Sequence, residues 1–279
     1  MDSHAHLDFF DSETRKKCIA NARAEGVEYF VVPGVSSSGW RGIREMAEQS
    51  GEGKVFFGFG VHPTEVQGEE NCENLGQELD RAVETVVGNG LVAIGEIGLD
   101  YYHLPNSGRD QKKAHQRKAF RVQIQVAKEK NLPLIIHCRD CDGETAAWKD
   151  VQENLEKEEF PANRALIHSF AYGVEEMEKW CAKGGYVSFS GIATKPFATA
   201  VREAILRVPE GQMLIETDSP YLLPHGLIRK DADGKIPQNE PRNVVEIARL
   251  IQGLTGQSKG KILKQTLTNG LRFFSIQEQ

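Results

Sequence analysis

The chain contains no apolar run that approaches the roughly 20 residues needed to cross a bilayer. Its first residues, Met1-Asp2-Ser3-His4, show neither the basic nor the apolar part of a signal peptide. Basic residues do not dominate either, because 34 Lys and Arg face 40 Asp and Glu and the net charge is −6. Non-specific binding along duplex DNA depends on many basic contacts to phosphate. We therefore expect a cytoplasmic protein, with no membrane attachment, that holds any nucleic acid at one local site.

Cysteine is sparse as well, with five residues scattered over the chain at Cys18, Cys72, Cys138, Cys141 and Cys181. An odd, scattered set in a long chain argues against a disulfide framework and for a reducing compartment. Cys138 and Cys141 form a C-x-x-C, but the sequence has no second cysteine pair to complete a zinc site. We therefore expect the thiols to be unlinked.

Short β-branched or aromatic runs recur along the chain and predict buried strands. They lie at Tyr29–Val32, Val55–Gly60, Leu91–Ile97, Leu134–His137, Ala165–His168, Tyr186–Phe189 and Met213–Glu216. Stretches with helical spacing separate them, such as Phe120, Ile124 and Ala127 at i, i+4 and i+7. A similar stripe predicts a last helix that covers the core, and it consists of Leu263, Leu267, Leu271 and Phe274.

A chain of 279 residues with this strand–helix alternation fits a single (β/α)8 TIM barrel that spans residues 1–279 as one domain. A doubly wound open sheet would give a similar alternation, but it concentrates polar residues at one switch point. Here polar residues follow strand after strand, as they do at the C-terminal ends of barrel strands. They are His4, His6, His62, Glu96, His137, His168 and Asp218. This distribution favours the barrel.

Imidazole and carboxylate side chains at these positions are the ligands that divalent metals take in proteins. His4 and His6 lie on one side of an extended segment, since side chains alternate with period 2. Glu96 follows an apolar strand directly, where a carboxylate is costly to bury unless it is paired or binds a metal. Asp218 follows the last predicted strand in the same way. The pattern predicts a metal-dependent hydrolase, because two dications bridged by a carboxylate activate water at a phosphoryl centre.

Arg139 stands two residues beyond His137. A guanidinium offers paired donors that match two phosphate oxygens, although a surface ion pair would fit this spacing equally well. Aromatic residues near predicted loops, among them Tyr102 and Tyr221, could stack on nucleobases or could simply pack. The sequence leaves both alternatives open.

Several blocks of the chain resemble the signatures of TatD-type deoxyribonucleases, which belong to the amidohydrolase-like barrel superfamily. The blocks include Asp2-Ser3-His4-Ala5-His6, Gly60-Val61-His62-Pro63, Gly95-Glu96-Ile97-Gly98, Leu134-Ile135-Ile136-His137 and Glu216-Thr217-Asp218-Ser219. They occur in the family's order and cover nearly the whole chain. Only Met1 precedes Asp2, so we expect a short first strand that holds His4 and His6 loosely.

The resemblance implies a hydrolase that removes nucleotides from DNA ends, acting on single strands or strand ends, with two divalent ions (Mg²⁺, Mn²⁺ or Zn²⁺). The metal ligands that the resemblance implies are His4, His6, Glu96, His137, His168 and Asp218. Glu96 would bridge the ions, His62 would lie near the scissile phosphate, and Asp218 would accept the proton of the attacking water. Arg139 and Lys195 are the expected substrate-binding residues, and no obligate protein partner is evident.

Two other functions remain open on this sequence. The same barrel could hydrolyse another ester or a C–N bond, as in aminoacyl-tRNA deacylation, because fold does not fix function. Alternatively, the chain could be an inactive barrel retained as a binding protein. The complete set of candidate ligands favours the enzyme.

Overall fold

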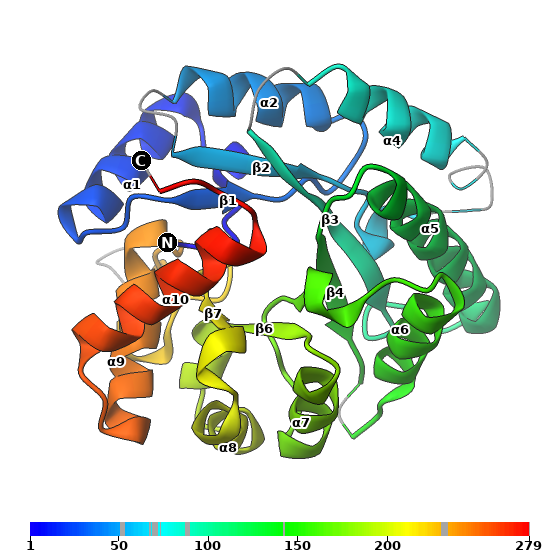
Figure 1. Ribbon diagram of the computed structural model, residues 1–279. Coiled ribbons are helices and arrows are strands. Elements are labelled where there is room, and N and C mark those ends of the chain that lie inside the picture. The colour runs from blue at the N-terminus through cyan, green and yellow to red at the C-terminus, as the bar shows by residue number, and fades with distance from the viewer. Residues whose placement is uncertain are drawn as a thin grey trace. The chain divides into compact units, whose positions relative to one another are not determined.

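The computed structural model describes residues 1–50, 54–66, 68, 72, 74–86, 90–141, 143–229 and 234–278 (Figure 1). The chain divides into two compact units: unit 1 is Met1–Val32, Ser50–Val55 and Ser169–Gln279, and unit 2 is Pro33–Gln49 and Phe56–His168. Both units combine parallel strands with helices, so the predicted α/β alternation is confirmed. None of the helices in the described part of the chain has the length and apolarity needed to cross a membrane.

Four parallel strands form the centre of unit 2, hydrogen-bonded in the order β2, β3, β4, β5. Helices α5 and α6 pack against β3 and β4 (Figure 1). The strands are buried almost throughout, which explains their continuous apolar runs. The elements are α2 (Trp40–Gln49), β2 (Val55–Phe59, whose first residue is counted with unit 1), η2 (Pro63–Glu65), α4 (Leu75–Glu84), β3 (Leu91–Asp100), α5 (Arg109–Glu129), β4 (Leu134–Arg139), α6 (Ala146–Lys157), η3 (Ala162–Arg164) and β5 (Ala165–Ile167).

In unit 1, strands β6 and β7 pair in parallel, and α9 and α10 pack against β7. The elements are η1 (Leu7–Phe9), α1 (Ser12–Ala24), β1 (Phe30–Val32), α7 (Val174–Ala182), β6 (Tyr186–Phe189), η4 (Gly191–Thr194), α8 (Thr199–Arg207), η5 (Glu210–Gln212), β7 (Met213–Ile215), η6 (His225–Leu227), η7 (Pro241–Asn243), α9 (Val244–Thr255) and α10 (Lys259–Phe273). Each of the seven strands that the sequence predicts therefore has its counterpart.

An extended segment at the start of the chain lies between β1 and β7 in unit 1. The amide of Ala5 donates to the carbonyl oxygen of Val31 at 3.0 Å, on the β1 side. On the β7 side, the amide of Ser3 donates to the carbonyl oxygen of Ile215 at 3.2 Å. His4 is fully buried. The segment is thus held more firmly than the sequence suggested, while the effect on metal affinity stays a prediction.

Candidate metal centre

One carboxylate oxygen in unit 2 lies against three imidazole rings. Oε1 of Glu96 is 2.8 Å from Nε2 of His168, 2.9 Å from Nδ1 of His137 and 3.3 Å from Nε2 of His62. Nδ1 of His137 and Nε2 of His168 are themselves 3.3 Å apart. Glu96 and His168 are buried, and His62 and His137 are partly exposed. We call these four residues the Glu96 cluster.

Parallel pairing explains why residues far apart in the sequence meet in this cluster. His62 follows β2, Glu96 lies in β3, His137 lies near the end of β4 and His168 follows β5. The C-terminal ends of parallel strands lie at the same edge of a sheet, so their side chains converge there. The β3–β4 register shifts between Ile94 and Ile97, around Glu96. Such irregularities re-aim a side chain and are frequent beside active sites.

Gly98 allows β3 to approach β4 closely enough for these contacts. It pairs with His137, and its φ of +139° is a conformation that side chains with a Cβ rarely adopt. A Cβ added at Gly98 would lie 2.0 Å from the carbonyl oxygen of His137. Only glycine fits this position, so the glycine at position 98 has a structural cause.

Asp100, at the end of β3, orients His137 from the side opposite Glu96. Oδ2 of Asp100 is 3.1 Å from Nε2 of His137 and 2.8 Å from Nδ1 of His103. The side chain of Gln116 fixes this strand end, accepting from the Asp100 amide and donating to its carbonyl oxygen. A carboxylate that accepts from Nε2 leaves Nδ1 of His137 as the nitrogen with a free electron pair for a metal.

The charges of the cluster influence one another's protonation. Burial acts to raise the pKa of Asp100, but hydrogen bonds from His137 and His103 hold it well below its ordinary value. Burial acts to lower the pKa of His137, yet Asp100 and Glu96 raise it above the ordinary value. For His62, burial is the largest effect and its pKa is lowered, which favours the neutral, ligand-competent ring.

We expect Asp100→Asn to lower the affinity for the metal about 10- to 100-fold, the usual cost of losing an outer partner of a ligating histidine. Asparagine lacks the negative charge, and its NH2 group must face either the two imidazole rings or the His103 amide, which now donates to Oδ1 of Asp100. His103→Ala is the matched control, because this half-exposed ring contacts Asp100 without contacting Glu96. Isothermal titration of the metal-free variants with Mn²⁺ measures the affinity. Equal affinities for Asp100→Asn and wild type would show that Asp100 does not position His137.

A second cluster lies in unit 1, and we call it the His4 cluster. Nε2 of His4 and Nε2 of His6 are 3.2 Å apart. Oδ1 of Asp218 lies 3.6 Å from the first nitrogen and 3.3 Å from the second. Both histidines are buried and Asp218 is 14% exposed in its side chain. The period of 2 along the first segment brings both rings to one side, as the sequence predicts.

Asp218 is positioned by the backbone around it. Its φ of +54° is in the left-handed region, which Asp and Asn tolerate better than most residues. The amide of Asp218 donates to the carbonyl oxygen of His4 at 2.9 Å. Fully buried Asp2 accepts from the amide and hydroxyl of Thr217, at 2.9 and 2.5 Å. Burial raises the pKa of Asp2 to about 7, against the opposing effect of these bonds.

Both clusters have the chemistry of a divalent-metal site. Imidazole nitrogens and carboxylate oxygens are ligands of Zn²⁺, Mn²⁺ and related ions. In each cluster, ligand atoms of one trio lie within 4.8 Å of one another: His4, His6 and Asp218 in unit 1, and His62, Glu96 and His137 in unit 2. Two neighbouring imidazole nitrogens that both point their electron pairs inward would repel unless a cation lay between them. The residues present therefore fit a bound dication.

The two predicted substrate-binding residues have other neighbours. The guanidinium of Arg139 lies over the ring of Tyr102, 4.1 Å from its centroid, and its side chain is exposed. The ammonium of Lys195 donates to the carbonyl oxygen of Leu223 at 3.0 Å, and burial lowers its pKa. Neither is a member of the two clusters, so their roles toward substrate stay predictions.

Asp100 and Asp2 support the two clusters through His137 and Thr217, and the sequence patterns alone give neither of them a role. Asp100 could have been found by its spacing, because Glu96, Gly98 and Asp100 share one face of a strand with period 2. The apolar run, however, predicts a strand that ends at Ile97, three residues before the observed end. For Asp2 the chain offers no comparable signal, since its partner Thr217 is 215 residues away.

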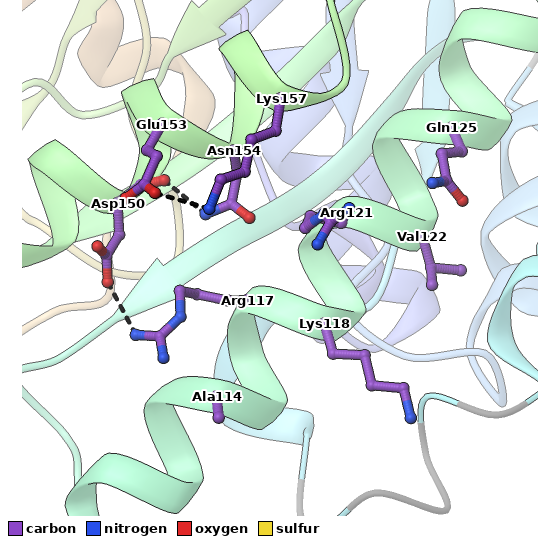
Figure 2. A pocket seen from close by; sticks show the side chains of 10 residues that line it. All are labelled: Ala114, Arg117, Lys118, Arg121, Val122, Gln125, Asp150, Glu153, Asn154 and Lys157. Atoms are coloured by element: carbon purple, nitrogen blue, oxygen red, sulfur yellow. Dashed lines mark hydrogen bonds and ion pairs between the residues drawn. The ribbon is translucent and has the colours of Figure 1, made fainter.

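A cavity of about 540 Å³ lies between α5 and α6 in unit 2 (Figure 2), and no residue of the Glu96 cluster lines it. Its lining carries Arg117 and Asp150, whose charged groups are 3.0 Å apart. Lys157 is paired with Glu153 at 2.6 Å. Asp150 also accepts from the buried Tyr101 hydroxyl at 2.5 Å. Because Arg117 and Lys157 are each paired with a carboxylate of α6, the cavity has the character of a salt-bridged groove.

The five cysteines are thiols, as expected.

Comparison with known proteins agrees with the sequence resemblance. The family model for TatD-related DNases matches residues 1–275. The metal-dependent hydrolase YcfH of Escherichia coli (strain K12) is 32% identical over 99% of this chain and 96% of its own length. A Shigella flexneri serotype 5b protein named 3′-5′ ssDNA/RNA exonuclease TatD is 27% identical over 95% of this chain and 94% of its own.

The crystal structure of YjjV, a TatD homologue from Escherichia coli, aligns with a TM-score of 0.81 at 24% identity. The alignment covers 99% of this chain and 98% of YjjV, so the two share a fold. The family match over nearly the whole chain and the relative at 32% identity lead to the same conclusion. The chain belongs to the TatD-related DNase family of metal-dependent hydrolases.

Proposed function

We propose that this hydrolase cleaves phosphodiester bonds at the ends of single-stranded nucleic acid, DNA in particular, in a reaction that requires divalent ions. The observation that carries the proposal is the Glu96 cluster, in which one carboxylate oxygen faces three imidazole nitrogens within 3.3 Å. A mixed set of nitrogen and oxygen ligands suits the ions that hydrolytic enzymes use. The name of the Shigella relative, an exonuclease for single-stranded DNA and RNA, supports this choice of substrate.

We further propose that residues 1–279 form one (β/α)8 barrel domain with a centre for two ions. Resemblance to the family supports this proposal. His4 and His6 would hold one ion, His137 and His168 the other, and Glu96 would bridge them. Metal analysis of the purified protein tests the number of ions, with two equivalents per chain expected. One equivalent at saturating Mn²⁺ would contradict the bridged pair.

When bound, the ions would activate water for attack and offset the negative charge of the phosphodiester. Asp218 would accept the proton of the attacking water, since its carboxylate lies beside His4 and His6 and its side chain remains partly exposed. His62 would contact a phosphate oxygen from the edge of the Glu96 cluster. Arg139 and Lys195 would hold the phosphates of the strand end. On an acidic protein, positive charge at this one site would be enough to bind a strand end.

Arg139→Ala should lower kcat/KM for single-stranded DNA. The loss should correspond to about 1.5–3 kcal/mol of transition-state stabilisation, the typical contribution of a charged hydrogen bond. Bound metal should be unchanged, because Arg139 lies on Tyr102 and is not a ligand. Arg139→Lys should recover only part of the loss, since a point charge lacks the paired donors. The control is Arg41→Ala, an 86% exposed arginine paired with Glu45. If all variants cleave within about twofold of wild type, Arg139 is a surface residue.

The proposal is tested by incubating the protein with end-labelled single-stranded DNA, duplex DNA and RNA, across Mg²⁺, Mn²⁺, Zn²⁺ and a chelator. We expect stepwise release of nucleotides from single strands, abolished by the chelator. Charged tRNA and simple carboxylic esters serve as competing substrates in the same metals. Faster turnover of either would favour ester or C–N hydrolysis on this fold. Binding of single strands without any turnover would favour a binding protein.

A further inference from the structure

Two exposed aromatic rings lie beside the metal-ligand candidate His6 in unit 1. Phe9 belongs to η1 and is 44% exposed, and Tyr221 follows β7 and is 53% exposed. The ring of Phe9 is stacked on the imidazole of His6, with centroids 5.0 Å apart and an interplanar angle of 12°. Tyr221 stands edge-on to both rings, with centroids 6.2 Å from each. We call Phe9 and Tyr221 the aromatic pair.

The arrangement of this pair differs from ordinary surface aromatics. Single exposed apolar side chains are common and need no explanation. These two rings instead contact one another and the same metal-ligand candidate, although they come from segments about 210 residues apart in sequence. Both keep about half of their surface open to solvent. Partly exposed aromatic rings beside a candidate metal ligand are suited to a planar, aromatic part of the substrate.

We propose that the aromatic pair is a stacking platform for the nucleobase adjacent to the scissile phosphate. The inference rests on the proposed nuclease function and specifies its substrate. Stacking on aromatic side chains binds bases of any sequence, because every base has a π face. A base within a duplex is already paired and stacked, and its release costs free energy. The platform therefore selects an unpaired terminal nucleotide that carries a base.

The stacking of Phe9 on His6 offers a competing role for Phe9, that of positioning a metal ligand. The two roles differ in what they change. A positioning residue would alter metal affinity and would affect all substrates equally. A stacking residue would affect only substrates with a base at the contacted nucleotide and would leave metal affinity unchanged.

The test compares oligonucleotides that end in an ordinary nucleotide with oligonucleotides that end in a stable abasic residue, at the 3′ or the 5′ end. The variants are Phe9→Leu and Tyr221→Leu, which retain apolar volume but lose the π face. Phe9→Tyr is the conservative variant. Leu206→Ala, an exposed apolar residue of α8 in the same unit, is the control. Metal affinity and the Kd for a cleavage-resistant phosphorothioate oligonucleotide are measured on each protein.

We expect wild type to cleave the base-bearing end about tenfold faster in kcat/KM than the abasic end, as one stacked base contributes on this order. Phe9→Leu and Tyr221→Leu should lose this preference and bind the phosphorothioate oligonucleotide about tenfold more weakly, with unchanged metal affinity. Phe9→Tyr should regain the preference and Leu206→Ala should keep it.

Three results would overturn the inference, and they are distinguishable. If wild type cleaves base-bearing and abasic ends equally, the nuclease function stands and the platform does not exist. If Phe9→Leu weakens metal binding and slows both substrates alike, Phe9 positions His6 and contacts no base. If wild type neither cleaves nor binds any oligonucleotide with metal bound, the proposed function itself fails and the inference fails with it.

Discussion

Glu96→Gln should remove most of the bound dication and lower kcat/KM by more than about 100-fold, a loss larger than that of an outer-shell partner. A single atom, Oε1 of Glu96, contacts all three of His62, His137 and His168. Glutamine preserves the size of the side chain but removes its negative charge, so the attraction for a dication is lost. Elemental analysis of the purified variant, with circular dichroism as a check of folding, measures the effect.

Glu153→Gln is the matched control for this substitution. Glu153 is a carboxylate in the same unit, on α6, and it pairs with Lys157 one helical turn away. Exposed pairs of this kind contribute little, so metal content and activity should equal those of wild type. A Glu96→Gln protein that retains the wild-type amount of metal would show that the Glu96 cluster does not form the metal site.

Asp218→Asn should lower kcat by about 10²- to 10⁴-fold, the range that a positioned general base contributes. Asparagine is the informative replacement, because it tolerates the φ of +54° at this position as aspartate does. It cannot accept a proton at neutral pH. His4 and His6 remain in place to hold metal, so metal content should fall much less than in Glu96→Gln. Single-turnover kinetics on end-labelled DNA measures the chemical step.

Asp110→Asn, at an exposed position in the first turn of α5, is the control for removing one negative charge and should behave as wild type. A kcat of Asp218→Asn within twofold of wild type would exclude the role as base. A parallel loss of metal and kcat would instead assign Asp218 to the ligand set of the His4 cluster alone.

The strands and the polar residues at their ends could be predicted from the sequence because both depend on local patterns. Buried parallel strands are short apolar runs, and the side chains that follow them converge at one sheet edge. Thus Glu96, His137 and His168 meet as expected within unit 2. The end of β3 was missed because Gly98 interrupts the apolar run, although its role is to let β3 approach β4. Asp100 was missed for the same reason.

The last helix shows how far periodicity predicts burial. Leu271 and Phe274 of the expected stripe are buried, but Leu263 and Leu267 are only partly buried, and Thr266 and Asn269 are buried as well. The side-chain amide of Asn269 donates to the carbonyl oxygens of Glu210 and Met213. A polar residue is buried at little cost when distant backbone groups satisfy it, and a helical pattern contains no information on such partners.

The direction of a side chain likewise could not be predicted from the sequence. Arg139 could point into the site or along the surface with the same spacing from His137. Its contact with Tyr102 depends on the loop after β3, and the contact of Lys195 with Leu223 depends on a backbone carbonyl 28 residues away. The aromatic pair could not be predicted for the same reason, because Phe9 and Tyr221 approach one another only in the folded chain.

In the function proposed above, cleavage of nucleic acid depends on divalent ions held by these histidines and carboxylates. A titration of the metal-free protein with Mn²⁺ tests this dependence, following bound metal and the release of nucleotides from single-stranded DNA in the same samples. We expect release to rise from zero in step with metal binding, and Glu96→Gln to abolish both. Nucleotide release by wild type in excess chelator, or full metal binding with no release, would contradict it.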